Sequence, residues 1–140
     1  MEDLQAGRGL DIRVAKEVLH YQVKMTRSWG RNFFVLYGEA GQRVDDWHLL
    51  QTEEEAWKKA TPHFSTDVAA AWQIVEHIVA NKSGEFRLIH RQTYGPEPQF
   101  AAGFGKAPCE EPKYILGETG PLAICRAALK AVEAEKKAGQ

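Results

Sequence analysis

The sequence has few cysteines and no long apolar segment. Cys109 and Cys125 form neither a CxxC metal motif nor the several pairs that a disulfide-stabilised scaffold needs. No apolar stretch reaches the roughly 20 residues of a membrane-spanning helix. Met1 is followed by acidic and glycine-containing sequence, whereas a signal peptide begins with a basic region. We therefore expect a soluble, intracellular protein that has no contact with a membrane.

The chain also lacks an excess of charge of one sign. It carries 18 basic and 19 acidic residues, which gives a formal net charge of -1. Proteins that adhere to nucleic acid by charge alone depend on an excess of Lys and Arg. We therefore expect no generic nucleic-acid binding, although this balance leaves room for a local basic pocket.

Motifs for metal binding and catalysis are missing as well. The five histidines are dispersed, without an HExxH motif or a pairing with cysteine at the spacing of zinc ligands. Cys125 lies on an apolar helical stripe, which is typical of a core residue rather than a nucleophile. A nucleotide hydrolase would need a base or a metal beside the phosphate, so we expect a protein that is not an enzyme and uses no cofactor.

Hydrophobic periodicity predicts helices alternating with short strands. Helices are expected to begin near residues 10, 52, 66 and 119, and strands are expected at residues 33–37, 42–50, 86–91, 100–104 and 113–116. The order α-β-β-α-α-β-β-β-α predicts an α/β (α+β) fold, a small three-layer α/β/α sandwich with a largely antiparallel sheet. Residues 1–9 are expected to form a flexible lead-in and residues 10–137 a single domain.

Capping residues predict where several of these helices begin. Asp11 is the expected N-cap of the first helix. Thr52 followed by Glu55 forms a capping box. Ser65 or Thr66 is expected to cap the third helix, whose apolar face should bury a tryptophan, Trp72, in the core.

Three blocks of sequence carry a resemblance to a known family. They are residues 10–19 (LDIRVAKEVL), residues 64–72 (FSTDVAAAW) and residues 121–129 (PLAICRAAL). In this order they resemble the phage ABA sandwich domain, a family of small proteins of bacteriophages and prophages, and they are distantly similar to the phage NinX-like family. The resemblance implies a three-layer sandwich and a phage origin, but no particular reaction.

Candidate ligand-binding residues lie at two helix starts. Ser65 and Thr66 precede one helix, and Thr119 and Gly120 precede the other. Free backbone N–H groups at a helix start attract phosphates and carboxylates. Arg126, in the second turn of the last helix, has the planar guanidinium that binds phosphate bidentately. If the two starts converge, they predict a joint anion site.

Each of these residues also has a purely structural interpretation. The hydroxyl groups need do no more than cap their helices. Arg126 would then form an ion pair with a carboxylate such as Asp67 or Glu76.

Aromatic residues near arginines complete the candidate site. Trp47, with Arg43 close in sequence, is a candidate to stack a base while the arginine binds phosphate. Trp29 and Trp57 also lie in or beside loops or segments of mixed polarity. Covering a small core is the alternative role for all three tryptophans.

Two classes of function follow from these residues. The first is a phage-encoded, non-enzymatic protein of the host cytoplasm that sequesters a small anionic nucleotide, an immune signal of the host. The second is a protein–protein interaction module, either an inhibitor of a host protein or a self-assembling subunit. Tryptophans are frequent anchors of interfaces, and open sheet edges favour homo-oligomers.

Overall fold

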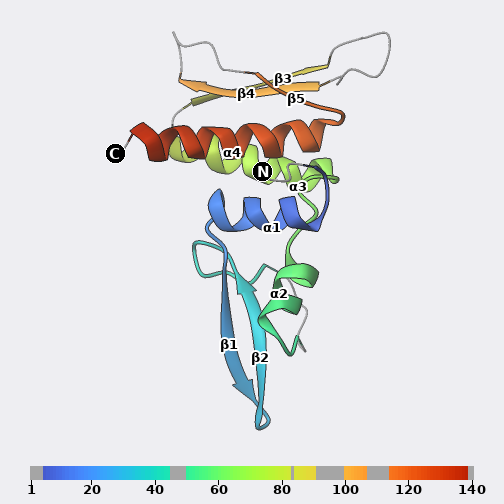
Figure 1. Cartoon of the computed structure of the whole chain (residues 1–140). Coiled ribbons are helices and arrows are strands. Elements are labelled where there is room, and N and C mark those ends of the chain that lie inside the picture. Colours follow the sequence, from blue (N-terminus) through green and yellow to red (C-terminus); the bar gives the residue numbers. More distant parts are fainter. Residues whose placement is uncertain (1–4, 45–49, 83, 91–99, 107–113, 139–140) are drawn as a thin grey trace.

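The computed structural model describes residues 5–44, 50–82, 84–90, 100–106 and 114–138 (Figure 1). The elements are α1 (Arg8–Glu17), β1 (Gln22–Ser28), β2 (Arg31–Tyr37), α2 (Glu53–Ala60), α3 (Val68–Lys82), β3 (Gly84–His90), β4 (Phe100–Lys106), β5 (Ile115–Gly117) and α4 (Gly120–Ala138). The series of helices and strands has the predicted order, although β1 stands where the sequence predicts no strand and residues 42–50 form no strand among those described. In these segments, no helix combines the length and the apolarity needed to span a membrane.

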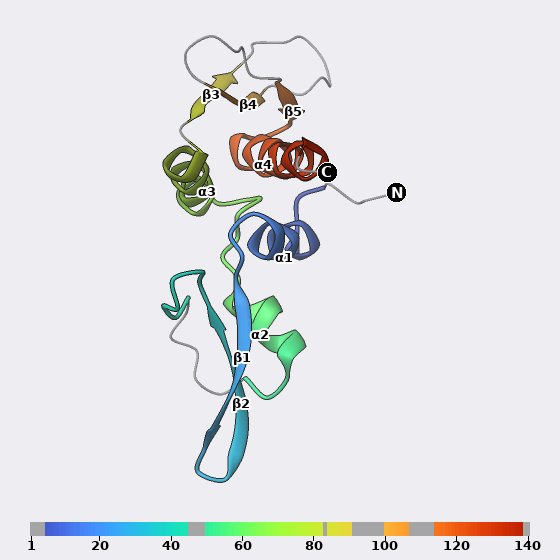
Figure 2. The same cartoon turned by 90° about the vertical axis from the view of Figure 1, so that its left-hand side faces the viewer.

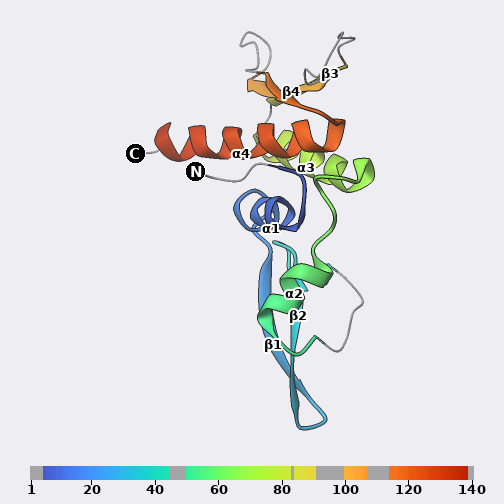
Figure 3. The same cartoon turned by 45° about the vertical axis from the view of Figure 1, so that its right-hand side comes forward.

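The described strands form two separate antiparallel sheets. β1 pairs with β2, and β4 lies between β3 and β5. The three-stranded sheet covers one side of α3 and α4, while α1 lies on the other side of these helices (Figures 1 and 2). Beyond α1, the β1–β2 hairpin and α2 project away from the body (Figure 3). The α+β class and the antiparallel pairing are confirmed, with the three-stranded sheet layered on α3 and α4 and the hairpin projecting beyond α1 (Figure 1).

Two hydrophobic clusters stabilise this arrangement. The larger one joins α1, α3, α4 and the three-stranded sheet, and Phe64 is completely buried within it. The smaller one packs Leu36 of β2 against Leu50 and the buried face of α2. Tyr21 and Trp57 contact both clusters, so these two aromatic rings connect the hairpin to the body.

The first helix begins earlier than the sequence predicts. Its N-cap is Gly7, and Asp11 lies within the helix, where it is 1% exposed. The expectation that Asp11 caps the helix is therefore wrong, and residues 8 and 9 belong to the helix rather than to a lead-in. Arg8 explains the extra turn, because its guanidinium donates hydrogen bonds to backbone carbonyls at the end of α2.

The first hairpin has a different partner from the expected one. β2 pairs with β1 across a two-residue turn at Trp29 and Gly30, from Gln22↔Tyr37 to Ser28↔Arg31. The segment expected to pair with it, residues 42–50, forms a bridge between Arg43 and Tyr37. The N–H of Val44 also donates to the carbonyl of Leu36, and the N–H of Phe34 donates to the carbonyl of Leu50. Residues 45–49 lie outside the described part of the chain.

Helix α3 buries only part of the expected face, because the buried side is shifted toward Ala70 and Ile74. Ala71, Ile74 and Ile78 face the core, whereas Trp72 is 48% exposed. Placing Trp72 in the core was therefore wrong. The apolar stripe of α3 is wider than the surface that α4 and β3 cover, so one edge of it remains in solvent.

Helix α2 begins and ends as the sequence predicts. The backbone N–H of Glu55 donates to the hydroxyl oxygen of Thr52 at 3.1 Å, and the helix ends at Ala60, before Pro62.

Candidate functional site

Two parallel helices bring their N-terminal ends together. α3 and α4 lie side by side, and both begin at the right-hand end in Figure 1. A pocket of about 510 Å³ lies at this end of the helices. It is lined by Gln5, Ala6, Ser65, Thr66, Glu118, Thr119, Leu122 and Arg126. The structure thus brings Ser65, Thr66, Thr119 and Arg126, which the sequence singles out, to one place.

The two helix starts are capped by different residues. Thr119 caps α4, because its hydroxyl oxygen accepts a hydrogen bond from the N–H of Leu122 at 3.3 Å. Asp67 caps α3, because its carboxylate accepts from the N–H of Ala69 at 2.9 Å. The expectation that Ser65 or Thr66 caps α3 is therefore wrong. Thr66 lies exposed at the pocket.

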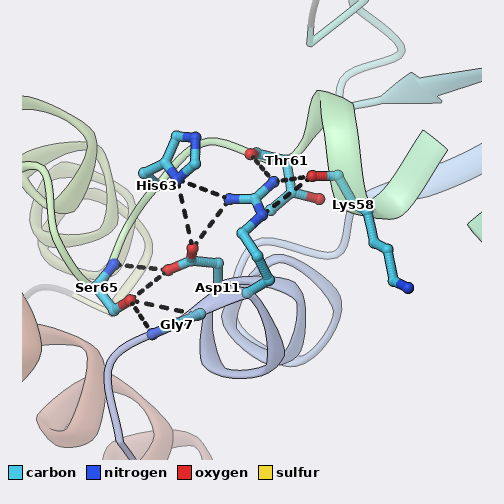
Figure 4. Close-up of polar contacts among 7 residues, drawn as sticks. Gly7, Asp11, Lys58, Thr61, His63 and Ser65 are labelled. Carbon is cyan, nitrogen blue, oxygen red and sulfur yellow. Dashed lines mark hydrogen bonds and ion pairs between the residues drawn. The ribbon is translucent and has the colours of Figure 1, made fainter. Parts of the chain in front are cut away.

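Ser65 supports the pocket and does not offer its hydroxyl to a ligand. Its hydroxyl donates to Oδ1 of Asp11 at 2.6 Å and accepts from the N–H of Gly7 at 3.0 Å (Figure 4). Its backbone N–H donates to the same Asp11 oxygen at 2.8 Å. With an exposed fraction of 0%, Ser65 fixes the chain that leads into α3 against α1. Its predicted role as a ligand contact is replaced by this structural one.

Arg8 extends this polar junction to the end of α2. Its Nη1 lies 3.0 Å from Oδ2 of Asp11, and its Nη2 donates to the carbonyl oxygen of Thr61 at 2.6 Å. Both Nε and Nη2 also donate to the carbonyl oxygen of Lys58 (Figure 4). Asp11 is thus a buried carboxylate that is fully paired, as buried charges must be.

The polar junction contains the residue types of a catalytic Ser-His-Asp triad but not its geometry. These residues are Asp11, His63 and Ser65. Nδ1 of His63 lies 3.1 Å from Nη1 of Arg8 and 4.0 Å from Oδ2 of Asp11, and no hydrogen bond joins the described His63 and Ser65 (Figure 4). A nucleophilic serine must be reachable by substrate and hydrogen-bonded to its base. Ser65 is neither, so the cluster holds the fold together.

Arg126 connects strand β5 to helix α4 at the edge of the pocket. Its Nη1 donates to the carbonyl oxygen of Leu116 at 3.0 Å and lies 3.8 Å from Oε2 of Glu118. The described carboxylate beside Arg126 is therefore that of Glu118, and neither Asp67 nor Glu76 takes that place. Arg126 is 18% exposed and lines the pocket.

Gly117 allows the close approach of β5 to α4 that places Arg126 and Glu118 together. A Cβ atom at Gly117 would lie 2.7 Å from the backbone nitrogen of Ala123. Gly120, also a candidate ligand contact, is buried beside Leu88 and Phe100 and does not line the pocket.

The remaining candidates are not brought to the pocket. Arg43 lies exposed and bridges Tyr37 of β2. The β1–β2 hairpin lies across α1 from α3 and α4 (Figure 1). Trp47 lies outside the described residues. Gln5 and Glu118 also line the pocket, although the sequence does not single them out. The second was hidden because only the folded chain shows that its carboxylate meets an arginine eight positions later.

The surroundings of Cys125 make its thiol a poor nucleophile. It is completely buried in the larger hydrophobic cluster. Burial, together with the negative charge of Asp11, raises the pKa of its thiol well above the usual range. The described residues contain no group of three His, Cys, Asp or Glu side chains placed to bind a metal ion.

Fold and pocket together define a small α+β protein whose two parallel helices share a ligand-sized cleft at their starts. Its sequence matches the Phage ABA sandwich domain over residues 12–129, and the chain therefore belongs to this family. The fold is similar to that of a phage protein from Bacillus cereus ATCC 14579, known from a 2.0 Å crystal structure. The two share 19% sequence identity with a TM-score of 0.55, over 95% of this chain and 93% of that chain, which is a likeness of fold alone. No protein with a curated description matches the sequence.

Proposed function

We propose that this phage protein is a non-enzymatic binding protein that holds the phosphate of a nucleotide in the pocket at the N-terminal ends of α3 and α4. By doing so it would sequester a nucleotide signal in the cytoplasm of the infected host. The observation that supports this proposal is the position of two parallel helix starts and Arg126 around one pocket. Helix N-termini attract anions through the helix dipole and their free N–H groups, and a guanidinium adds a charged, bidentate donor.

The size and lining of the pocket fit a small organic anion. A volume of about 510 Å³ lies within the range of small-molecule sites. Leu122 and Ala6 supply apolar surface, and Thr66 supplies a hydroxyl group. Glu118 is the one carboxylate of the lining, and a bound phosphate would take its place beside Arg126. Because Glu118 is 62% exposed, it can turn into solvent at little cost.

Isothermal titration calorimetry against linear and cyclic nucleotides, with inorganic pyrophosphate as the minimal probe, tests this proposal. Arg126→Ala should weaken binding about 10- to 150-fold, and Arg126→Lys should restore it only in part. Arg87→Ala is the matched control, since Arg87 is an exposed arginine that does not line this pocket. Absence of heat with every member of the panel would refute the proposal.

Recovery of the bound nucleotide separates sequestration from catalysis. After incubation with excess protein, chromatography should return the nucleotide chemically unchanged. Turnover would instead identify a hydrolase and overturn the non-enzymatic part of the proposal.

A second candidate function is self-association through α3. Val68, Trp72 and Val79 form an exposed apolar stripe, with exposed fractions of 65%, 48% and 36%. Beside this stripe, a groove of about 720 Å³ separates α3 from β3. Its lining carries both signs of charge, with Glu76, Glu85 and Arg87 among its residues. A patch of mixed charge can pair with its own copy about a two-fold axis, which favours a homodimer.

Sedimentation velocity over a range of protein concentrations tests this second candidate. Trp72→Ser should shift a dimer to monomer, because it removes the largest apolar side chain of the patch. Trp29→Ser, at an exposed tryptophan on the hairpin, should leave the mass unchanged. A wild-type protein that is monomeric at every concentration would exclude self-association.

A further inference from the structure

The β1–β2 hairpin ends in an exposed tryptophan far from the pocket. Figures 1 and 3 show this hairpin projecting from the body, with its turn at the opposite end of the molecule from the three-stranded sheet. Trp29 lies in that turn and is 92% exposed. Met25, on β1 near the turn, is 59% exposed. The tip therefore offers apolar surface that the fold itself does not use.

The backbone at the tip is unfavourable for a tryptophan. Trp29 has φ 51° and Gly30 has φ 74°, so both turn residues adopt the left-handed conformation. Two-residue turns of this kind strongly favour Asn-Gly, because a bulky side chain is strained at positive φ. Trp29 thus combines backbone strain with an indole ring in water, and neither stabilises the folded state. Departures of this kind from local rules are typical of functional positions.

The same hairpin is basic in a chain whose net charge is negative. Residues 22–37 contain Lys24, Arg27 and Arg31 but no Asp or Glu, so the rest of the chain has an excess of acidic residues. Arg27 pairs across the ribbon with Asn32, and Arg31 pairs with Ser28. Because adjacent cross-strand pairs alternate between the faces of a ribbon, the two arginines lie on opposite faces.

Neither arginine is neutralised by the described part of the chain. Among those residues, no ion pair is formed by Arg27 or Arg31. The acidic first turn of α2, Glu53–Glu55, follows Leu50, whose carbonyl accepts from the N–H of Phe34. It therefore follows a segment that pairs with the middle of β2 and not with the turn.

We propose that this tip binds single-stranded nucleic acid. Trp29 stacks on one base, and the arginines on either face contact the flanking phosphates. A single strand fits better than a duplex, because an indole ring stacks on the face of a base and duplex pairing covers that face. This site is separate from the pocket at the N-terminal ends of α3 and α4. The low net charge of the chain does not prevent nucleic-acid binding here, because the basic residues are concentrated on the hairpin.

Fluorescence anisotropy with a labelled oligothymidylate of about 12 nucleotides at low salt tests the proposal. Trp29→Asn should weaken binding about 5- to 150-fold while raising the midpoint of thermal unfolding, because Asn-Gly suits this turn. Trp29→Phe should retain most of the affinity. Ile89→Asn, at an exposed apolar residue of β3, should leave it unchanged. Arg27→Ala and Arg31→Ala should each reduce the slope of log affinity against log salt by about 0.7.

Several outcomes would overturn the proposal. One is an oligonucleotide that does not bind at low salt, and another is equal binding by Trp29→Asn. A lowered unfolding midpoint for Trp29→Asn would make the tryptophan a structural residue. Equal affinity for a duplex, unaffected by Trp29, would indicate groove binding by the ribbon. Binding to phosphatidylglycerol vesicles without binding to the oligonucleotide would assign the tip to an anionic lipid surface.

Discussion

The carboxylate of Asp11 lies 2.6 Å from the hydroxyl of Ser65, and neither residue is more than 1% exposed. These residues are 54 positions apart and belong to the first two sequence blocks that resemble the family. Cys125, from the third block, lies in the same buried cluster as Leu10 of the first block and Phe64 of the second. The three blocks therefore meet where α1, the lead into α3, and α4 pack together. The first two also share a polar junction that holds α1 against the chain leading into α3.

Removing the Asp11 carboxylate should be strongly destabilising. Asp11→Ala leaves the hydroxyl and N–H of Ser65 without their acceptor and takes the partner carboxylate from Arg8. We expect the free energy of unfolding to fall by about 3 kcal/mol, measured by urea denaturation.

Two further variants serve as references for this fall in the free energy of unfolding. Asp11→Asn keeps an oxygen for Ser65 but loses the charge opposite Arg8, so its effect should be smaller. Asp67→Ala removes an exposed N-cap carboxylate and should cost about 1 kcal/mol. If Asp11→Ala cost no more than Asp67→Ala, the junction would not have the structural role assigned to it.

Local signals predicted the helices well, because their causes are local. The capping box at Thr52 and the cap at Thr119 depend on side chains within three residues of the N–H groups they bind. Strand β1 was not predicted, because its residues are mostly polar. Its pairing with β2 also depends on a left-handed backbone at Trp29, a conformation that tryptophan rarely adopts. Trp72 was misplaced because the apolar stripe of α3 is wider than the surface that its neighbours cover.

The pocket could be predicted only in part. Sequence placed Thr66, Thr119 and Arg126 at or near helix starts, but their convergence depends on α3 and α4 running in the same direction. That direction is set by the connections through β3, β4 and β5, which carry no local signal for it. The contact between Glu118 and Arg126 depends on the close approach at Gly117 and was equally hidden.

Two glycines should respond in opposite ways to alanine. At Gly117 the new methyl group would lie 2.7 Å from the backbone nitrogen of Ala123, so β5 must move away from α4. We expect Gly117→Ala to lower the free energy of unfolding by about 1–3 kcal/mol. Gly9 lies within α1 with no atom within 4 Å of the same position, so Gly9→Ala should stabilise the protein by about 0.5–1 kcal/mol. Thermal unfolding of both variants checks the pair, and a neutral Gly117→Ala would show that the β5–α4 contact is loose.

Stability should fall at alkaline pH. The ordinary thiol pKa is 9.0, and burial raises that of Cys125, so above pH 9 the unfolded chain releases a proton that the folded chain keeps. The free energy of unfolding should then decrease as pH rises, by up to about 1.4 kcal/mol per pH unit. Burial also raises the pKa of Tyr21 from 10.0, which adds a decline of the same sign above pH 10. Urea denaturation between pH 8 and about pH 10 should give a shallower decline for Cys125→Ala. Equal slopes in both proteins would contradict this role of the buried thiol.

Neutralising Glu118 should strengthen anion binding. Its carboxylate lies 3.8 Å from Nη1 of Arg126 and lines the pocket, so it competes with a phosphate for the guanidinium and repels it. A charge about 6 Å away in a largely hydrated site contributes about 1 kcal/mol per unit of ligand charge, so Glu118→Gln should tighten pyrophosphate binding roughly 5-fold or more. The gain should shrink at high salt, because screening weakens repulsion between exposed charges. Glu85→Gln, at an exposed carboxylate on β3, should leave the affinity unchanged in the same titration. If Glu118→Gln weakened binding instead, the carboxylate would be holding Arg126 in position for the ligand, and the competition between the two anions would be refuted.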